Sequence, residues 1–358
     1  MGRLRSQHRL LERAIGRHDR ELVVRLLLEE DASLSGAAQR ASAYPLLSGA
    51  SRLADASGNS GPNDAEELSP DRLHKAWPAQ GTPYSEIEKR NSALADQLDR
   101  DVPRSISFFK PDELQEDYLQ QLHDLLYTHF RDVPTKRYGY VQGFHAIAAN
   151  LLRSTKSKES AQTTLDRLLP VYLLDACVDL SHAMSWCTLI FLIAALYIAA
   201  SPSLQLQSPL HCALQQRLIE PTSILAWPLT IMGQSRKTSI AHQDQIPLIL
   251  DGLLAGGTAH FLYVSALLLV HALQVTPLSQ LDHNVLTDYP ARYSEDSSTL
   301  WADLMQKARA LQKDVPIKDV LLMASIPAED DHRNGTALWS TLMGLPPRQI
   351  RPVQVPSW

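Results

Sequence analysis

Two short stretches of the sequence hold side chains that could do chemistry together. The stretch LDRDVPR at 98–104 ends in Arg104, and the stretch RYGYVQGFH at 137–145 holds Gln142. The leucines between them are spaced for one helical face, so a helix could present the arginine and the glutamine side by side. GTP hydrolysis needs a guanidinium to neutralise charge on the phosphates and a carboxamide to orient the attacking water. The pair therefore suits acceleration of GTP hydrolysis.

Each residue also has a simpler interpretation. Arg104 could be a surface arginine paired with Asp101 three positions back, an interaction worth a few tenths of a kcal/mol on a helix. Gln142 could be a helix N-terminal residue that hydrogen-bonds nearby backbone. An arginine supplied to GTP in trans is worth about 10³ to 10⁵ in rate, or roughly 4–7 kcal/mol of barrier. For Arg104 taken alone the simpler interpretation is favoured, and the matching Gln142 motif reverses that order. For Gln142 the simpler interpretation stays open.

The two stretches resemble the signatures of a known family. Its motifs are I-x-x-D-x-x-R and Y-x-Q-G, and the matching residues stand here in the right order and spacing: Leu98, Asp101, Arg104, Tyr140, Gln142 and Gly143. This family is the TBC domain, whose members are GTPase-activating proteins for Rab GTPases in vesicle-mediated transport. The resemblance implies an all-α, multi-helical TBC-like domain. It extends over roughly residues 20–330.

The resemblance implies that Arg104 and Gln142 are two catalytic fingers, with the glutamine replacing the GTPase's own water-positioning glutamine. The partner would be a Rab-family small GTPase in its GTP form. That partner carries GTP and Mg²⁺, so we expect no cofactor in this chain. Neither a G-x-x-x-x-G-K-[ST] phosphate loop nor a G-x-S-x-G motif occurs, which is typical of an activator that does not itself hydrolyse GTP.

Four further residues would support the fingers. Asp101 would orient Arg104, the Tyr140 ring would shape the pocket, and Gly143 would allow close approach of the backbone. His145 follows the Gln-Gly pair and either supports the site or packs a helix. The chain has 13 histidines but no H-E-x-x-H motif and no Cys/His cluster with zinc spacing, so we expect no metal site.

Departures from the family pattern keep a second hypothesis open. Tyr44, with Arg40 upstream, stands where the family usually carries a tryptophan, and Ala146 stands where many relatives carry an acidic residue. The alternative is a catalytically silent TBC-like module that binds a Rab or serves as a scaffold. Which Rab is served does not follow from the fingers, because specificity is distributed over the contact surface.

Composition and charge narrow the class of partner and the compartment. The formal net charge is −5, so no global basic field favours nucleic acid. Three cysteines without C-x-x-C spacing lie in apolar surroundings, which is typical of buried thiols in a reducing compartment. The N-terminus has no apolar core of secretory type. We therefore expect a cytoplasmic protein with a protein partner.

The sequence predicts four segments. N-terminal helices of the domain occupy 1–47, a flexible insertion rich in Ser, Gly and Pro occupies 48–84, the domain body occupies 85–330, and a Pro-rich tail occupies 331–358. In the body, a helix runs towards Leu98, Pro103 ends it, and Arg104 follows on a loop stiffened by the proline. Another helix spans Asp112 to Phe130, and Gln142 lies near the start of the next.

The pattern of residues 3–30 predicts a helical hairpin. Its first helix ends near Gly16, and its second begins with Asp19 as N-cap. Arginines recur every fourth residue of its first helix and form a basic stripe: Arg5, Arg9, Arg13 and Arg17. A solvated face is the favoured interpretation of this stripe. The other interpretation is peripheral contact with anionic lipid, on endoplasmic reticulum or Golgi membranes, or with an acidic partner.

Two apolar runs, 187–200 and 261–273, are shorter than the ~20 residues that span a bilayer. We expect core helices, with the second region divided at Gly256-Gly257. An integral membrane helix pair is a third hypothesis that rests on these runs alone. Stretches at 223–227 and 250–254, together with His145, most resemble the endoplasmic-reticulum branch of the family, which acts on early secretory Rabs.

Overall fold

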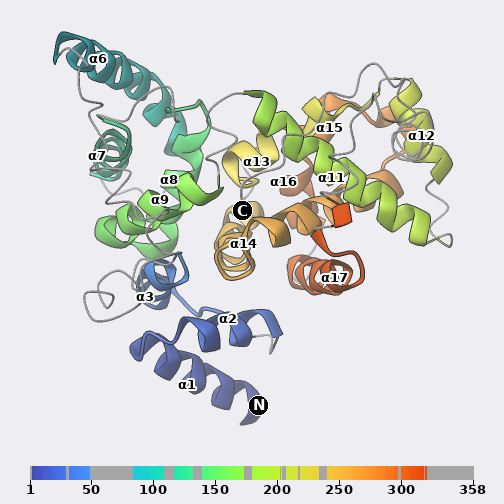
Figure 1. The fold of residues 1–358 in the computed structure, drawn as a ribbon, viewed down its shortest axis with the longest axis horizontal. Coiled ribbons are helices and arrows are strands. Elements are labelled where there is room, and N and C mark those ends of the chain that lie inside the picture. Colours follow the sequence, from blue (N-terminus) through green and yellow to red (C-terminus); the bar gives the residue numbers. More distant parts are fainter. Residues whose placement is uncertain are drawn as a thin grey trace. The chain divides into compact units, whose positions relative to one another are not determined.

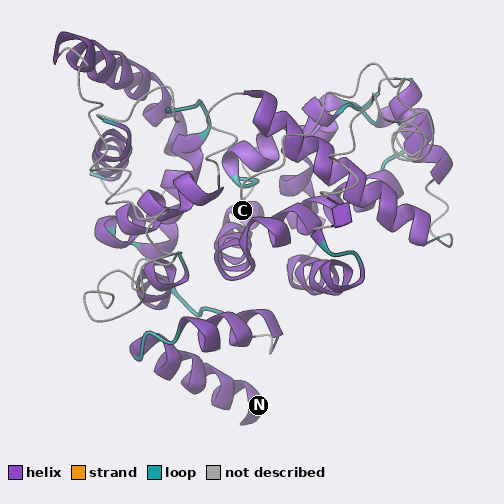
Figure 2. Ribbon diagram, in the orientation of Figure 1, coloured by secondary structure: helices purple, strands orange, loops and turns teal. Residues whose placement is uncertain are grey.

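The computed structural model describes most of the chain. The described residues are 2–29, 32–48, 84–108, 117–131, 139–172, 180–201, 203, 207–216, 218–233, 240–296, 300–317 and 319–320. Within these ranges all regular structure is helical, with 14 α-helices, short 3₁₀ helices (labelled η) and no strand (Figure 2). The predicted all-α fold is confirmed.

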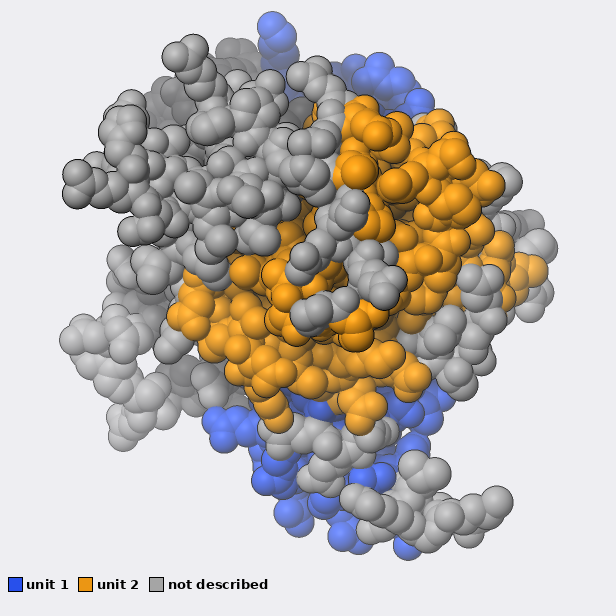
Figure 3. Space-filling model, turned by 90° about the vertical axis from the view of Figure 1, so that its right-hand side faces the viewer, with its two compact units in different colours: residues 1–178, 246–255 blue, residues 179–245, 256–358 orange. Residues whose placement is uncertain are grey.

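The chain folds into two compact units. The first holds residues 1–178 and 246–255, and the second holds residues 179–245 and 256–358 (Figure 3). The segment 246–255 belongs to the long helix α14 (Ile240–Val275), so a piece of chain from far along the sequence completes the first unit. The two motifs that hold Arg104 and Gln142 both lie in the first unit.

The first unit is built around one fully buried helix. Its elements are α1 (Gly2–Gly16), α2 (Arg20–Glu29), α3 (Ala37–Leu47), α6 (Tyr84–Asp101), η1 (Val102–Phe108), α7 (Tyr118–Phe130), α8 (Phe144–Thr155) and α9 (Lys158–Tyr172) (Figure 1). Every residue of α8 is buried, and α3, α7, α9 and η1 all pack against it. Helix α8 therefore fixes the position of η1, which carries Arg104.

The N-terminal hairpin forms as predicted. Helix α1 ends at Gly16, α2 begins at Arg20, and the two helices pack together. The Asp19 carboxylate accepts a hydrogen bond of 3.0 Å from the Leu22 backbone N–H. An N-cap side chain satisfies in this way one of the donors that the first helical turn leaves without a partner.

The segment around Pro103 differs from the prediction. Helix α6 continues to Asp101, and Pro103 is the second residue of η1 rather than a terminator. Proline is tolerated in the first turn of a helix because the N–H that it lacks would have no helical partner there. Arg104 therefore lies on a 3₁₀ helix that continues from α6. The prediction that Arg104 lies on a loop is wrong.

Other predictions for the first unit have mixed outcomes. Gln142 lies directly before Gly143, the residue that precedes α8, so its place near a helix start is confirmed. Helix α7 is described from Tyr118 onward, and the predicted start at Asp112 lies outside the described residues. The insertion, apart from its ends, and the tail 331–358 also lie outside them, so the four-segment division stays a prediction.

The second unit contains both apolar runs that we expected to form core helices, 187–200 in α11 and 261–273 in α14. Its elements are α11 (Leu180–Ala200), α12 (Gln207–Gln215), η3 (Pro221–Ile224), α13 (Ala226–Thr230), the outer parts of α14, η4 (Leu278–Gln280), α15 (His283–Thr287), α16 (Tyr289–Asp296) and α17 (Leu300–Asp314). In α11, Cys187, Phe191 and Ile193 are fully buried. The Trp227 indole N–H donates to the Leu286 carbonyl at 2.9 Å, which joins α13 to α15.

Helix α14 is interrupted where we expected it. Gly257 has φ 70° and ψ −174°, so two helical segments meet at this residue. Among the described residues, α14 is the one helix long and apolar enough to cross a membrane by length and composition. However, 83% of its most apolar stretch is buried within the fold, as in the core helix of a soluble protein. This burial favours a core helix over the membrane hypothesis.

Candidate functional site

Arg104 and Asp101 form an ion pair that is buried at one end only. Asp101 is the last residue of α6 and Arg104 lies in the first turn of η1, so the three-residue spacing places both side chains on one face. The Arg104 Nη1 donates to Asp101 Oδ1 at 2.8 Å. Asp101 is 4% exposed, whereas the Arg104 side chain is 59% exposed. The pair with Asp101 that the simpler interpretation predicted is present, and its carboxylate is buried, so that it holds a side chain that projects outward.

Tyr140 completes the hydrogen bonding of this carboxylate. Its hydroxyl donates to Asp101 Oδ2 at 3.1 Å, so each carboxylate oxygen has its own donor. Burial raises the pKa of Tyr140, and the negative charge of Asp101 raises it further. The phenol therefore keeps its proton at neutral pH. The ring contacts Phe130 and Phe144 edge-on, with centroid distances of 5.5 and 6.3 Å.

His145 lies in the first turn of α8 and is 2% exposed. Its Nδ1 is 3.1 Å from the Tyr140 hydroxyl and 3.3 Å from the Gly143 backbone nitrogen. Burial lowers the pKa of His145, and the positive charge of Arg104 lowers it further, against the raising influence of Asp101. The imidazole is therefore neutral near pH 7.

Gln142 occupies the turn that leads into α8. Its side chain is exposed, while the adjacent Gly143 is buried. Gly143 has φ 115° and ψ −27°, a backbone conformation that residues with a Cβ rarely adopt. Glycine at this position thus allows the chain to reverse between Tyr140 and α8 and leaves the glutamine on the surface.

The structure brings the predicted supporting residues together. Asp101, Arg104, Tyr140, Gly143 and His145 form one connected set of hydrogen bonds, and Gln142 lies within the turn that this set holds. Among the described residues, no group of three or more His, Cys, Asp or Glu side chains is arranged to hold a metal ion. The chemistry that this site offers is hydrogen bonding and positive charge at the surface.

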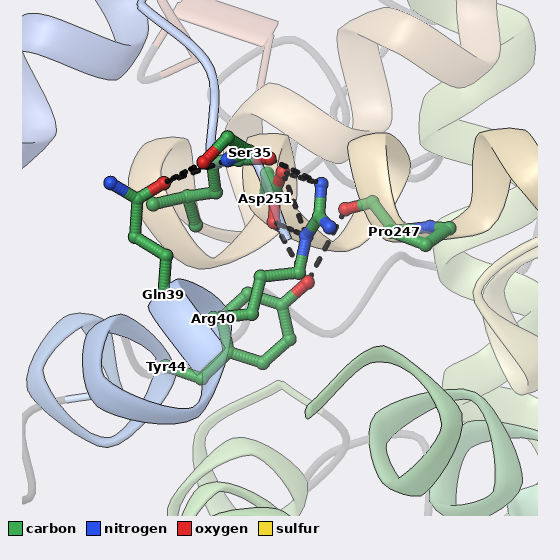
Figure 4. A network of polar contacts seen from close by, with 7 residues as sticks. Ser35, Gln39, Arg40, Tyr44, Pro247 and Asp251 are labelled. Atoms are coloured by element: carbon green, nitrogen blue, oxygen red, sulfur yellow. Dashed lines mark hydrogen bonds and ion pairs between the residues drawn. The ribbon is translucent and has the colours of Figure 1, made fainter. Parts of the chain in front are cut away.

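The first unit holds a second polar network, which the sequence did not predict (Figure 4). The Arg40 guanidinium makes a two-point contact with Asp251, with Nε 3.1 Å from Oδ1 and Nη2 3.0 Å from Oδ2. The Tyr44 hydroxyl donates to Asp251 Oδ1 at 2.7 Å. Arg40 Nη2 also donates to the Leu34 carbonyl at 2.9 Å. This network attaches α3 to the part of α14 that belongs to the first unit.

The network is buried, which points to a structural role. Tyr44 is fully buried, and Asp251 is 4% exposed. Burial raises the pKa of Asp251, and the Arg40 charge and the hydrogen bonds from Arg40 and Tyr44 oppose that rise. The available sequence signal was the four-residue spacing of Arg40 and Tyr44 and the isolated acid in an apolar run. Tyr44, which stands where the family usually carries a tryptophan, is thus a buried core residue.

The sequence matches the family model of the Rab-GTPase-TBC domain over residues 38–272. This match covers more than half of the chain and includes α3 from its second residue onward, both motifs and the Asp251 segment of α14. The chain therefore belongs to the Rab-GTPase-TBC domain family. Membership supports a general role as a Rab GTPase-activating protein in vesicle transport, with Rab small GTPases as partners. A search of curated proteins finds no match to the chain.

Proposed function

We propose that this protein stimulates GTP hydrolysis by a GTP-bound Rab and that Arg104 and Gln142 supply the two catalytic side chains. One observation carries the proposal: buried Asp101 bonds both the exposed Arg104 and Tyr140, which lies two residues before the exposed Gln142. The two candidate fingers therefore project from segments joined by the same carboxylate. The Arg104 side chain, held by this ion pair, loses little freedom when a substrate binds.

The chemical step needs little from the activator beyond these two groups. Water attacks the γ-phosphorus of GTP, the bond from that phosphorus to the bridging oxygen breaks, and negative charge develops on the phosphate oxygens. Arg104 donates N–H groups to those oxygens, and the Gln142 carboxamide orients the water. The Rab supplies the nucleotide and Mg²⁺. An arginine in this role contributes about 10³ to 10⁵ in rate.

Single-turnover hydrolysis by a panel of GTP-loaded Rabs tests this proposal. We expect the wild-type protein to accelerate at least one Rab well above its intrinsic rate. A panel that includes early secretory Rabs and shows no acceleration would sink the proposal. If the protein retains GTP-loaded Rab in a pull-down and yet leaves turnover unchanged, the silent binding module is the better description.

We further propose that the substrate is an early secretory Rab. His145 after the Gln-Gly pair and the stretches at 223–227 and 250–254 resemble the endoplasmic-reticulum branch of the family. The rank order of rates in the Rab panel tests this assignment. A preference for a Rab of the endocytic pathway would contradict it.

The exposed face of α1 supports peripheral attachment to membranes. Arg9, Arg13 and Arg17 are all exposed at four-residue spacing, and the opposite face is buried through Leu11 and Ile15. Each basic residue near an anionic bilayer contributes about 1 kcal/mol of attraction. We propose a cytoplasmic protein that contacts the anionic surface of endoplasmic reticulum or Golgi membranes through this face.

Co-sedimentation with vesicles tests the membrane contact. Vesicles with anionic headgroups should retain the protein at low salt and release it as ionic strength rises, because exposed charges are screened by salt. A triple variant with Arg9, Arg13 and Arg17 each changed to Gln should lose this binding. Equal retention of wild type and triple variant would exclude the α1 face.

A further inference from the structure

One nitrogen of His145 contacts both segments that carry the proposed fingers. Through the Tyr140 hydroxyl, 3.1 Å away, Nδ1 is connected to Asp101 and so to Arg104. Through the Gly143 backbone nitrogen, 3.3 Å away, it contacts the turn that holds Gln142. The finger segments come from either side of α7, so this contact joins parts of the chain that are separated in sequence.

The proton on Nδ1 decides which of these contacts is a hydrogen bond. With a lone pair, Nδ1 accepts from the Gly143 N–H, and Tyr140 has one hydroxyl proton to direct at either Nδ1 or Asp101. With a proton, Nδ1 donates to the Tyr140 oxygen, and the Tyr140 hydroxyl proton is committed to Asp101. The Gly143 N–H would then have no acceptor at Nδ1, so both contacts are available only to the tautomer that carries its proton on Nε2.

Burial of the Gly143 N–H favours the lone pair on Nδ1. This N–H donates to Nδ1, with the two nitrogens 3.3 Å apart, and a buried donor that loses its acceptor costs about 1–3 kcal/mol. With the lone pair on Nδ1, the Tyr140 hydroxyl lies 3.1 Å from each of two acceptors, Asp101 Oδ2 and Nδ1, and shares its proton between them. Nδ1 therefore accepts from both finger segments, and Arg104 donates to the other oxygen of Asp101.

We propose that His145 is a positioning residue that couples the two fingers, holding Arg104 through Tyr140 and Asp101 and holding the Gln142 turn through Gly143. This inference rests on the proposed function. It assigns His145 no contact with GTP or with the attacking water. Its effect is on the geometry in which both fingers meet the nucleotide, where a misplacement of about 1 Å can lower a rate about 100-fold.

Two substitutions of similar size separate positioning from packing. His145→Leu removes every polar atom, whereas His145→Asn keeps an amide group near the place of Nδ1. With the Rab that wild type accelerates most, we expect His145→Leu to lower the saturating single-turnover rate about 10- to 100-fold and leave the Kd for GTP-loaded Rab unchanged. His145→Asn should recover the rate to within a few-fold of wild type. Equal rates for the two variants, or a wild-type rate for His145→Leu, would overturn the inference.

A double-mutant cycle tests the route through tyrosine. Tyr140→Phe removes the hydroxyl that His145 and Asp101 share. If His145 acts through this hydroxyl on Arg104, the double variant Tyr140→Phe with His145→Leu should lose much less than the product of the two single losses. Losses that multiply would mean that the two side chains act independently and would overturn the proposed chain.

The same four proteins distinguish failure of this inference from failure of the proposed function. Their unfolding free energies, measured by denaturant without any Rab, should show coupling between Tyr140 and His145. If wild type accelerates hydrolysis and His145→Leu matches it, the positioning role fails while the activator function stands. If wild type accelerates no Rab, the activator function fails and the positioning role fails with it, whatever the coupling.

Discussion

The Arg104 guanidinium is bound to Asp101 across 2.8 Å, and the two side chains differ sharply in exposure. Asp101 is 4% exposed, and the Arg104 side chain is 59% exposed. A carboxylate fixed inside the fold therefore directs an arginine towards solvent. This relationship distinguishes Arg104 from an ordinary surface arginine, whose ion pair would be worth about 0–1 kcal/mol.

Asp101→Asn should lower GTPase activation because the amide keeps the shape of the side chain but loses the charge that holds Arg104. We expect the single-turnover rate to fall about tenfold or more. Asp99→Asn, on the same helix with a side chain 72% exposed, is the control and should match wild type. A variant at Asp101 that hydrolyses GTP at the wild-type rate would show that the ion pair does not direct the arginine.

Gly143→Ala should harm activation because φ 115° is strained for any residue with a Cβ. Strain of this kind costs about 1–3 kcal/mol, and its relief would shift the turn that holds Gln142. We expect a lower hydrolysis rate with a modest loss of stability. Gly139→Ala in the same segment is the control, because an added Cβ there meets nothing within 4 Å. Equal activity of the two variants would argue against a role for the turn geometry.

Asp251→Ala should strongly destabilise the fold because it leaves the Arg40 guanidinium, on a side chain that is only 15% exposed, without its carboxylate. Removal of one partner of a buried pair costs about 3–5 kcal/mol. Tyr44→Phe removes one hydrogen bond to the same carboxylate and should cost about 1–3 kcal/mol. Denaturant unfolding measures both changes, with exposed Asp244→Ala on α14 as control. Similar unfolding midpoints for Asp251→Ala and Asp244→Ala would refute the structural role.

The fold should lose stability in mild acid because of buried His260. Burial, together with the smaller influence of the Arg309 charge, lowers the pKa of His260 to about 4. The unfolded chain binds the proton near pH 6.5 and the native chain only near pH 4, so the free energy of unfolding falls as the pH drops between these values. The slope from one such group is up to about 1.4 kcal/mol per pH unit.

His260→Leu should reduce this slope. Among the described residues neither ring nitrogen of His260 has a hydrogen-bond partner, so leucine removes no such bond. Exposed His283→Leu on α15 is the control and should leave the slope as in wild type. An unchanged pH dependence in His260→Leu would mean that this histidine does not bind its proton in the unfolding step. Buried His242, whose pKa burial also lowers to about 4, should account for a similar share.

Periodicity and motif spacing predicted much of this fold because both report local geometry. The hairpin with its Asp19 cap, the core helices and the break at Gly257 all depend on residues close together in the chain. The continuation of α6 into η1 was missed because proline stops a helix interior but is tolerated in a first turn. That distinction depends on where the preceding helix ends, which the sequence indicates only to within a few residues.

The site was predicted residue by residue but not as a network. Asp101 with Arg104 follows from helical spacing, whereas the contacts of Tyr140 with Asp101 and of Arg40 with Asp251 join distant segments. Local spacing carries no information on which distant partners meet. The contacts of His145 Nδ1 with Tyr140 and Gly143 are of the same kind. They depend on the position that α8 gives to the His145 ring, which the sequence does not indicate.

Single-turnover GTP hydrolysis with Arg104→Ala and Gln142→Ala tests whether these two side chains act as catalytic fingers. The measurement uses the Rab that wild type accelerates most, at saturating activator, with exposed Arg100→Ala on α6 as control. We expect about 10³-fold or greater loss of acceleration for Arg104→Ala, a large loss for Gln142→Ala, and a wild-type rate for Arg100→Ala. Wild-type acceleration in either finger variant, with Rab binding intact, would contradict the two-finger mechanism.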